Sequence, residues 1–154
     1  MTDAEQRLQV RGQAPDWFHW AIGQRGQSRR VEVKGCSIHY LSWQPIEGAA
    51  DPGSILFLHG GGAHAHWWSH IAPYFRAGHR VAAMDLSGMG DSGERSEYNA
   101  SLRAAEIHAV IEAAGLGPKT YLVGHSFGGF MAMRYAAEHS DRLAGLVIAD
   151  SPLY

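Results

Sequence analysis

The feature that most constrains the fold of this chain is a strand–turn–helix pattern around Ser126. The sequence Gly-His-Ser-Phe-Gly at 124–128 follows a short apolar run and precedes a helix-forming stretch. Glycines at 124 and 128 would let neighbouring backbone approach a sharp turn closely. The first amides of the helix would then point toward any oxygen that develops negative charge beside Ser126. We therefore predict a strained turn with Ser126 at its tip; the alternative is an ordinary glycine-rich loop, in a chain with 19 glycines.

Strand and helix patterns alternate along the chain from residue 54 onward. The run Ile55–Leu58 is continuously apolar, as expected for a strand that helices bury on both faces. Further strands are expected at 80–84, 120–123 and 143–149, and helices at 65–75, 101–114 and 127–138. Upstream, residues 30–34 and 37–43 alternate apolar and polar side chains, which predicts an antiparallel pair. The predicted fold class is α/β, a mostly parallel twisted sheet with helices on both faces.

We place the main boundary of the chain after residue 28. Residues 1–28 form a polar N-terminal tail and a short helix, and residues 29–154 form one core. The aromatic side chains of Trp17, Phe18 and Trp20 are expected to pack against that core rather than to stack on a ligand. In the predicted helix 101–114, Leu102 is expected on the apolar side, with Ile107, Val110, Ile111 and Ala114.

Composition narrows the functional classes. A net charge of −2 provides no electrostatic case for binding nucleic acid or an anionic membrane surface. Cys36 is the only cysteine, which excludes an intrachain disulfide and a metal–thiolate cluster. The N-terminus lacks a signal-peptide layout, and no apolar run reaches transmembrane length. We therefore expect a cytoplasmic protein.

Three motifs follow successive predicted strands. They are His59-Gly-Gly-Gly62, the turn from Asp85 to Ser92, and the turn at Ser126. In open α/β sheets the carboxyl ends of the strands form the ligand crevice. In this order the three motifs resemble the α/β-hydrolase fold family, in its serine-nucleophile branch. The resemblance covers about residues 30–150 and corresponds to the first six strands of that fold, without the cap and the last strands.

The resemblance implies a chemistry for Ser126. It makes Ser126 the nucleophile of a serine hydrolase and assigns the oxyanion hole to the backbone N–H groups of Gly61 and Phe127. The implied reaction passes through an acyl-enzyme formed from a small carboxylic ester, lactone or related acyl compound. The resemblance implies no cofactor and no metal. Haloalkane dehalogenases and most epoxide hydrolases of the family carry aspartate where this chain has serine.

The partners of Ser126 are incomplete in this sequence. The family order is serine, acid, histidine, yet the only histidine after Ser126 is His139, which we expect at a helix end remote from the crevice. Asp150 follows the last strand, where some family members place the acid, but a structural carboxylate is the favoured interpretation. The apolar strand 143–149 would also be left with an unpaired edge.

We therefore expect the chain to be the N-terminal part of a longer hydrolase, inactive alone. Either the remainder of that hydrolase or a second chain would pair along the strand at 143–149. Three alternatives to an esterase-like hydrolase stay open. They are a cofactor-free haloperoxidase or perhydrolase, a carbon–carbon bond hydrolase, and a non-catalytic binding relative.

Two further motifs are weaker. Gly88–Gly93 matches a dinucleotide-binding fingerprint, but a polar loop follows it and no helix opens on its last glycine, so we predict a tight structural turn. The histidines at 64, 66 and 70 have metal-like spacing; we expect polar packing and helix capping instead. His125 is expected to face the interior, and His59 to brace its own loop.

Overall fold

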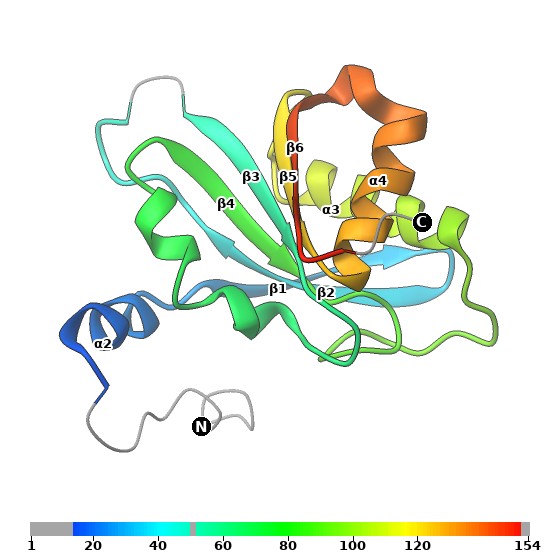
Figure 1. The fold of residues 1–154 in the computed structure, drawn as a ribbon, viewed down its shortest axis with the longest axis horizontal. Coiled ribbons are helices and arrows are strands. Elements are labelled where there is room, and N and C mark those ends of the chain that lie inside the picture. Colours follow the sequence, from blue (N-terminus) through cyan, green and yellow to red (C-terminus); the bar gives the residue numbers. More distant parts are fainter. Residues whose placement is uncertain (1–13, 50–51, 152–154) are drawn as a thin grey trace.

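The computed structural model describes residues 14–49 and 52–151. Its centre is a twisted sheet of six strands with the spatial order β1-β2-β4-β3-β5-β6 (Figure 1). The strands are β1 (Gln27–Val33), β2 (Cys36–Trp43), β3 (Gly53–Leu58), β4 (His79–Met84), β5 (Thr120–His125) and β6 (Leu143–Ala149). The α-helices are α2 (Asp16–Gly23), α3 (Ala100–Ala113) and α4 (Phe127–His139), and the 3-10 helices are η1 (Ala65–Trp68), η2 (Ala72–Phe75) and η3 (Ser140–Arg142).

The pairing of the strands confirms the predicted fold class. β1 pairs antiparallel with β2 and β2 antiparallel with β4, whereas β4, β3, β5 and β6 run parallel to one another. The central parallel strands β3 and β4 are the most buried of the parallel ones, because both faces of the sheet are covered there and their side chains alternate between two covered faces.

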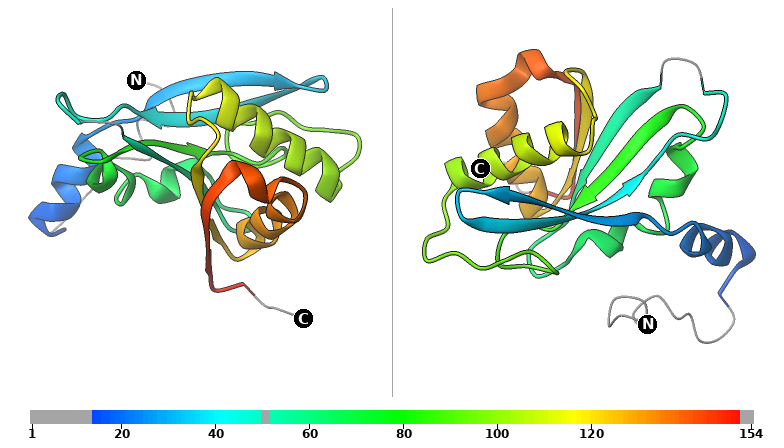
Figure 2. Two further views of the ribbon diagram at one scale, coloured as in Figure 1. Left: turned by 90° about the horizontal axis from the view of Figure 1, so that it is seen from above. Right: turned by 180° about the vertical axis from the view of Figure 1, so that it is seen from behind.

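Two hydrophobic clusters pack on the two faces of the sheet, and Figure 2 shows how the helical segments lie around that sheet. On one face, Leu56 and Leu122 pack with Ile107 of α3 and Tyr135 of α4. On the other, the cluster consists of side chains from the sheet and from η1 and η2: Leu41, Trp43, Ile55, Phe57, Val81, Ala83, Ala65, Trp68 and Ala72. Helical segments therefore lie on both faces, as predicted.

The predicted helix at 65–75 is wrong in detail. Residues 65–75 form two separate 3-10 turns, η1 and η2, in which amides bond to carbonyls three residues back, for example Ile71 to Trp68 and Tyr74 to Ile71. Pro73 explains the interruption, because it has no N–H for an α-helical bond and its ring would crowd the preceding turn.

The predicted apolar face of α3 also needs correction. Leu102 is only half-buried, and the helix instead buries Arg103 and Glu106 beside Ile107 and Val110. The helix begins where the Asn99 side chain accepts a hydrogen bond from the Leu102 N–H at 2.9 Å.

The aromatic side chains of α2 pack less than expected. Trp17 and Trp20 are about half exposed, although the ring of Trp20 lies 4.8 Å from that of Tyr74. α2 contacts the body through the buried Ala21 and through the Tyr74 hydroxyl, which donates to the Trp17 carbonyl. β1 begins at Gln27, ahead of the boundary placed after residue 28, and that division stays a prediction.

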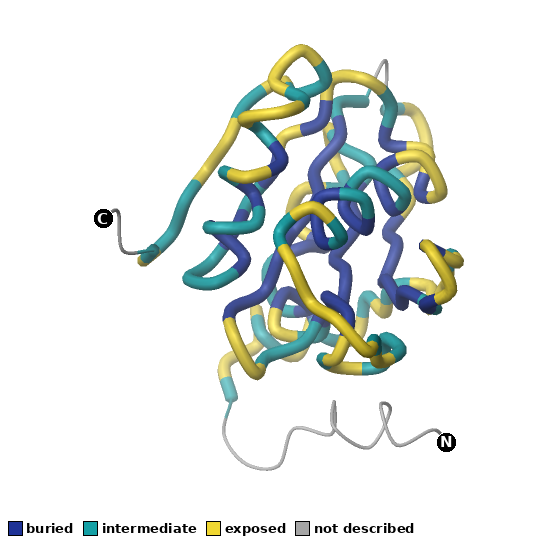
Figure 3. The backbone as a smooth tube through the Cα atoms, turned by 90° about the vertical axis from the view of Figure 1, so that its right-hand side faces the viewer, coloured by how far each residue is buried: buried dark blue, intermediate teal, exposed yellow. Residues whose placement is uncertain are grey.

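β6 lies at one edge of the sheet and pairs only with β5 among the described residues (Figure 3). Its Leu146 and Val147 are exposed, so the edge is apolar as well as unpaired. Folded proteins normally cover such an edge. Pairing of β6 with a further strand or with a second chain stays a prediction. Within the described residues no helix has the length and apolar character needed to cross a membrane.

Candidate active site

The junction of β5 and α4 forms the predicted sharp turn. Ser126 has φ 50° and ψ −117°, a conformation that strains any residue with a side chain. Its N–H donates to the Ala149 carbonyl of β6 at 2.9 Å, and its carbonyl accepts from the Gly129 amide at 2.9 Å. The turn is therefore held from both sides, and the alternative of an ordinary glycine-rich loop is wrong.

Close backbone approach explains the glycines that flank Ser126. A Cβ at Gly124 would lie 2.6 Å from the Gly128 carbonyl oxygen. One at Gly128 would lie 2.5 Å from the carbonyl oxygen of His59 and 2.6 Å from that of Leu58. Main-chain atoms cannot swing aside as a side chain can, so both positions require glycine. The start of α4 consequently lies directly against the end of β3.

The glycine loop after β3 lies beside the Ser126 turn. A Cβ at Gly60 would be 3.5 Å from the Ser126 Cβ, and one at Gly61 would be 3.7 Å from the Phe127 Cβ. Phe127 is the first residue of α4, so its N–H has no acceptor inside the helix. Among the described residues none accepts a hydrogen bond from the Gly61 N–H either. The structure thus brings Gly61, Ser126 and Phe127 together.

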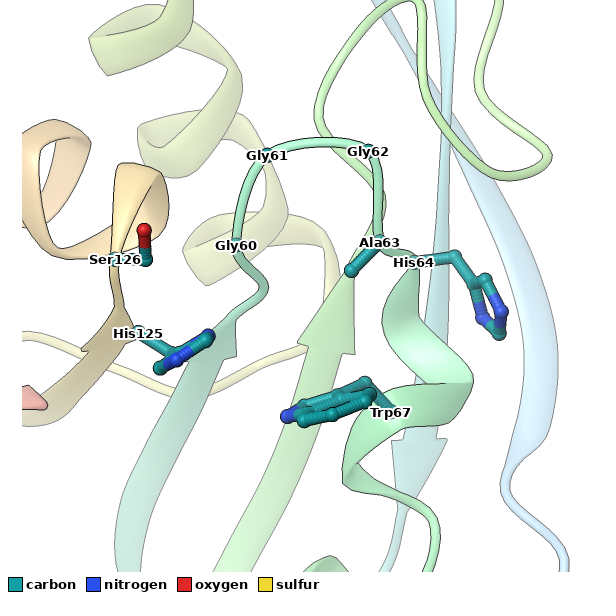
Figure 4. Close-up of a pocket in the computed structure, with 8 residues that line it drawn as sticks. All are labelled: Gly60, Gly61, Gly62, Ala63, His64, Trp67, His125 and Ser126. Atoms are coloured by element: carbon teal, nitrogen blue, oxygen red, sulfur yellow. The ribbon is translucent and has the colours of Figure 1, made fainter. Parts of the chain in front are cut away.

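A pocket of about 430 Å³ opens over this turn (Figure 4). Its lining consists of Gly60, Gly61, Gly62, Ala63, His64, Trp67, His125 and Ser126. One side is bare glycine backbone, and the other carries the rings of Trp67 and His125, whose centroids lie 6.1 Å apart at an interplanar angle of 15°. The pocket therefore combines open main-chain donors with an aromatic wall, as is common in small-molecule sites.

The placement of His125 corrects the prediction that it faces the interior. Along β5, Thr120, Leu122 and Gly124 are buried, so the alternate residue His125 points to the opposite side of the strand. That side carries η1, and the His125 ring consequently stacks toward Trp67 in the pocket (Figure 4).

His59 braces its loop, as predicted. The imidazole is fully buried; its Nδ1 donates to the Gly60 carbonyl at 2.7 Å, and its Nε2 accepts from the Leu86 N–H at 3.1 Å. The Leu86 amide can only donate, which assigns the proton to Nδ1. Burial lowers the pKa of His59, so the ring stays neutral and ties the loop after β3 to the loop after β4.

Asp85 is the hub of the loop after β4. Its carboxylate accepts from His39 Nδ1 at 2.8 Å, from the Ala65 N–H at 2.5 Å and from the Asp91 N–H at 2.8 Å. Burial alone would raise the pKa of this carboxyl, but these hydrogen bonds outweigh burial and lower it, so the group is ionised. The Ser92 hydroxyl adds a bond to the Asp85 carbonyl at 2.7 Å.

The glycine-rich segment in that loop is the tight turn that we predicted. Its Gly88 N–H donates to the Gly93 carbonyl at 2.8 Å, and α3 begins only at Ala100. No helix therefore opens on Gly93, which is what a pyrophosphate-binding turn would need.

The three histidines with metal-like spacing do not converge. The rings of His64 and His66 are 5.9 Å apart, while the His70 ring lies against Phe18. The capping expectation is wrong for His64, because η1 is capped by the Asp85 carboxylate and not by a histidine. Burial, aided by the neighbouring His64, lowers the pKa of His66.

In the part of the chain that the structure describes, the group with closely spaced ligand atoms is instead His39, Asp85 and Asp91, all within 4.8 Å. Three hydrogen-bond donors already occupy the Asp85 carboxylate. A cation would have to displace them, so this donor set is built for hydrogen bonding.

Neither candidate partner of Ser126, His139 or Asp150, forms a hydrogen bond with the Ser126 hydroxyl. His139 ends α4, at the opposite end of the helix from Ser126, and its ring packs on Tyr135 at 4.7 Å. Asp150 is exposed, with φ 51°, directly after the Ala149 that accepts from the Ser126 N–H. Within residues 14–49 and 52–151, no histidine nitrogen forms a hydrogen bond with Ser126 Oγ.

The sequence analysis missed two buried charged side chains of α3, those of Arg103 and Glu106. The Arg103 guanidinium lies 5.2 Å from the centre of the Phe127 ring and donates to the Ser87 carbonyl. Glu106 accepts from the Ser87 N–H at 3.1 Å and pairs with Arg95 at 2.8 Å. The signal was present: Arg103 and Glu106 are spaced three apart, on the same helical face as Ile107 and Val110.

Comparison with known proteins decides the family. A family model described as alpha/beta hydrolase fold matches residues 53–154. The chain belongs to the α/β hydrolase fold family. A haloalkane dehalogenase from Sphingobium indicum is 30% identical over 131 residues, which cover 82% of this chain and 42% of the relative. A lipase from Mycobacterium tuberculosis is 34% identical over 103 residues, which cover 67% of this chain and 39% of the lipase.

Solved structures of α/β hydrolases share the same architecture. The thioesterase domain from the curacin biosynthetic pathway superposes with a TM-score of 0.73 at 28% identity, covering 83% of this chain and 47% of that one. The chain therefore spans less than half the length of these relatives. The relatives' names describe different reactions, so the fold alone does not select one.

Proposed function

We propose that Ser126 is the nucleophile of a serine hydrolase that acts on a carboxylic ester, lactone or related acyl compound. The observation that carries the proposal is the strained Ser126 turn at φ 50°, with the Gly60–Gly61 backbone beside it at the mouth of the pocket. A strained backbone conformation persists only where the surrounding contacts hold it in place, and such conformations are concentrated at functional sites.

The proposed step uses Ser126 and Gly61, which line the pocket, and the N–H of Phe127, the residue after Ser126. Ser126 Oγ attacks the carbonyl carbon, and the carbonyl oxygen becomes an oxyanion between the N–H groups of Gly61 and Phe127. Two such donors stabilise the transition state, and the loss of one typically costs about 3 kcal/mol. The carbon–oxygen bond to the leaving group then breaks, the leaving oxygen takes up the proton that Ser126 lost, and water later hydrolyses the acyl-enzyme. None of these steps requires a cofactor or a metal.

The proton acceptor for Ser126 is the missing group. A serine hydroxyl is a weak nucleophile until a histidine accepts its proton. Because the chain spans less than half the length of its relatives, we propose that this histidine belongs to the remainder of a longer hydrolase, or to a second chain, alongside the exposed edge of β6. On this proposal the 154-residue chain alone does not turn over. A cytoplasmic location stays a prediction.

Serine at position 126 argues against dehalogenation, the reaction in the name of the Sphingobium relative. Displacement of a halide by a serine oxygen would leave an alkyl ether. An ether has no electrophilic carbonyl for water to attack, so the enzyme could not be regenerated. An acyl substrate leaves a hydrolysable ester on Ser126, as the lipase and thioesterase relatives would require.

The test is an alkyl fluorophosphonate, which forms a stable adduct on activated serines, mapped by peptide mass spectrometry. In the complete hydrolase, with every segment that supplies the histidine, we expect an adduct at Ser126 and none at position 126 in Ser126→Ala. Ser101→Ala, which removes an exposed serine at the start of α3, serves as the matched control and should leave the Ser126 adduct unchanged. A complete protein with no adduct at Ser126 would be a binding relative, and the proposal would fail.

A further inference from the structure

Three side chains on the β1–β2 side of the molecule form a continuous chain of hydrogen bonds. Ser28 Oγ lies 2.9 Å from His39 Nε2, and His39 Nδ1 lies 2.8 Å from Asp85 Oδ2. Ser28 comes from β1, His39 from β2, and Asp85 from the loop after β4. None of the three lines the pocket above Ser126.

The ionised Asp85 determines how the protons lie along this chain. A carboxylate can only accept, so His39 Nδ1 carries a proton and donates it to Asp85. In the neutral imidazole the other nitrogen then has a free lone pair. In that form His39 Nε2 can accept the hydrogen bond from the Ser28 hydroxyl. This is the arrangement in which an imidazole can take a proton from an attacking serine.

Burial gives the three groups different freedom. His39 and Asp85 are 2% and 1% exposed, and the amides of Ala65 and Asp91 hold Asp85 in place. The imidazole is consequently fixed by packing and by its partner. Ser28, in contrast, lies on an edge strand and is exposed, so a molecule in solution can reach its hydroxyl.

We propose that Ser28 is a second nucleophilic serine, which accepts acyl groups from small activated esters with His39 as its base and Asp85 orienting His39. Ser28 Oγ bonds to the carbonyl carbon, and its proton moves to His39 Nε2. The carbon–oxygen bond to the leaving group breaks, and the leaving oxygen takes the proton back from His39. The products are an O-acyl serine and a free alcohol or phenol.

Arg30 favours this reaction. It is the cross-strand partner of His39 in the β1–β2 register, and it lies two residues from Ser28 on the same face of the strand. It is exposed, so its guanidinium can reach an oxygen that becomes negative beside Ser28. A cation there stabilises the developing charge.

The experiment uses the full chain carrying Ser126→Ala, so that no adduct can form at position 126. The protein is treated with an alkyl fluorophosphonate; Ser28 Oγ would displace fluoride from phosphorus, and fluoride would leave as HF. The adducts at Ser28 and at Ser101 are then compared in the same digest. Ser101 is also an exposed serine, and the described residues provide no side-chain hydrogen bond for it.

We expect Ser28 to label about 100-fold faster than Ser101, the lower end of the effect of a positioned base. Ser28→Ala should remove this adduct, and His39→Gln should reduce its rate to that of Ser101 while circular dichroism shows an intact fold. Equal rates at Ser28 and Ser101, or a folded His39→Gln protein that labels as fast as its parent, would overturn the proposal. If His39→Gln does not fold, the labelling rate of Ser28 relative to Ser101 in the Ser126→Ala protein decides the proposal by itself. Labelling at Ser126 plays no part in this result, so the two proposals fail separately.

Discussion

The ends of β4 and β5 lie at the same edge of the sheet, separated only by β3, yet they are built in opposite ways. After β4, Asp85 accepts three hydrogen bonds through a buried carboxylate. After β5, Ser126 has a strained backbone, and the described residues form no hydrogen bond with its hydroxyl. The polar side chain after β4 has its hydrogen bonds inside the protein, whereas the one after β5 remains available to a ligand.

This difference separates two uses of a polar residue at a strand end. A buried group whose partners are all inside the protein stabilises the fold and has nothing left to offer a ligand. A partly exposed group without an internal partner keeps its lone pairs for a substrate, and at Ser126 it is the strained backbone that costs stability. The surroundings distinguish Asp85 from Ser126, since each directly follows a six-residue strand of the parallel part of the sheet. Substitutions at the ends of β4, β3 and β5 test this comparison.

The largest effect is expected for Asp85→Ala. The substitution leaves the Ala65 and Asp91 amides and the His39 N–H without their acceptor, and each buried unpaired donor costs about 1–3 kcal/mol. We expect a loss of about 4 kcal/mol in the free energy of unfolding, measured by urea denaturation at pH 7. Asp91→Ala, which keeps the Asp91 amide and removes only a partly exposed carboxylate, is the control and should cost far less.

The pH dependence of that loss has a definite sign. Hydrogen bonds hold the pKa of Asp85 below its usual value of 3.8, so its contribution is present above pH 3.8 and is lost as the pH falls through the lower folded pKa. The difference between the parent and Asp85→Ala should therefore narrow in acid. A difference that stayed constant down to the lowest pH at which the protein folds would contradict the role of the charged carboxylate.

Much of the fold and the turn at Ser126 could be predicted from local sequence. The strands from residue 54 onward follow from short, mainly apolar runs, and the first two follow from alternating side chains. The turn follows from Gly124, which lets β5 approach α4, and from Gly128, which lets α4 approach the end of β3. These features depend on spacing along the chain, which the sequence displays directly.

The features that could not be predicted depend on contacts between distant segments. The Asp85 hub joins β2, η1 and the loop at residue 91, and no local pattern places these together. Arg103 is buried because it finds Ser87 and Phe127, whereas its residue type alone favours the surface. His125 was misplaced because the predicted strand ended at residue 123, whereas β5 continues to His125 and its alternation decides which side chains face η1.

His59, at the end of β3 between the two strand ends, should give an intermediate effect. His59→Leu keeps the apolar volume but leaves the Leu86 N–H and the Gly60 carbonyl unpaired, which should cost about 2 kcal/mol at pH 8. Burial lowers the pKa of His59 below its usual 6.5, so protonation favours the unfolded chain and the contribution of His59 is lost as the pH falls below 6.5.

Leucine does not titrate, so the stability difference between the parent and His59→Leu should shrink between pH 7 and pH 5. Urea denaturation at each pH measures this. Some acid dependence should remain in the variant, because burial also lowers the pKa of His66. Equal dependence on pH in both proteins would show that the buried imidazole is not a neutral brace.

The smallest effect on stability is expected at Ser126, where a substitution should stabilise the fold rather than destabilise it. Glycine accepts a positive φ without a steric penalty, whereas alanine keeps the strain that serine has at φ 50°. The strain released is about 1–3 kcal/mol, and the added freedom of the unfolded chain takes back up to about 1 kcal/mol. Ser126→Gly should therefore be more stable than Ser126→Ala by about 1 kcal/mol in urea denaturation, although both lack the hydroxyl. If Ser126→Gly were no more stable than Ser126→Ala, the turn would not be strained, and the ends of β4 and β5 would differ only in hydrogen bonding.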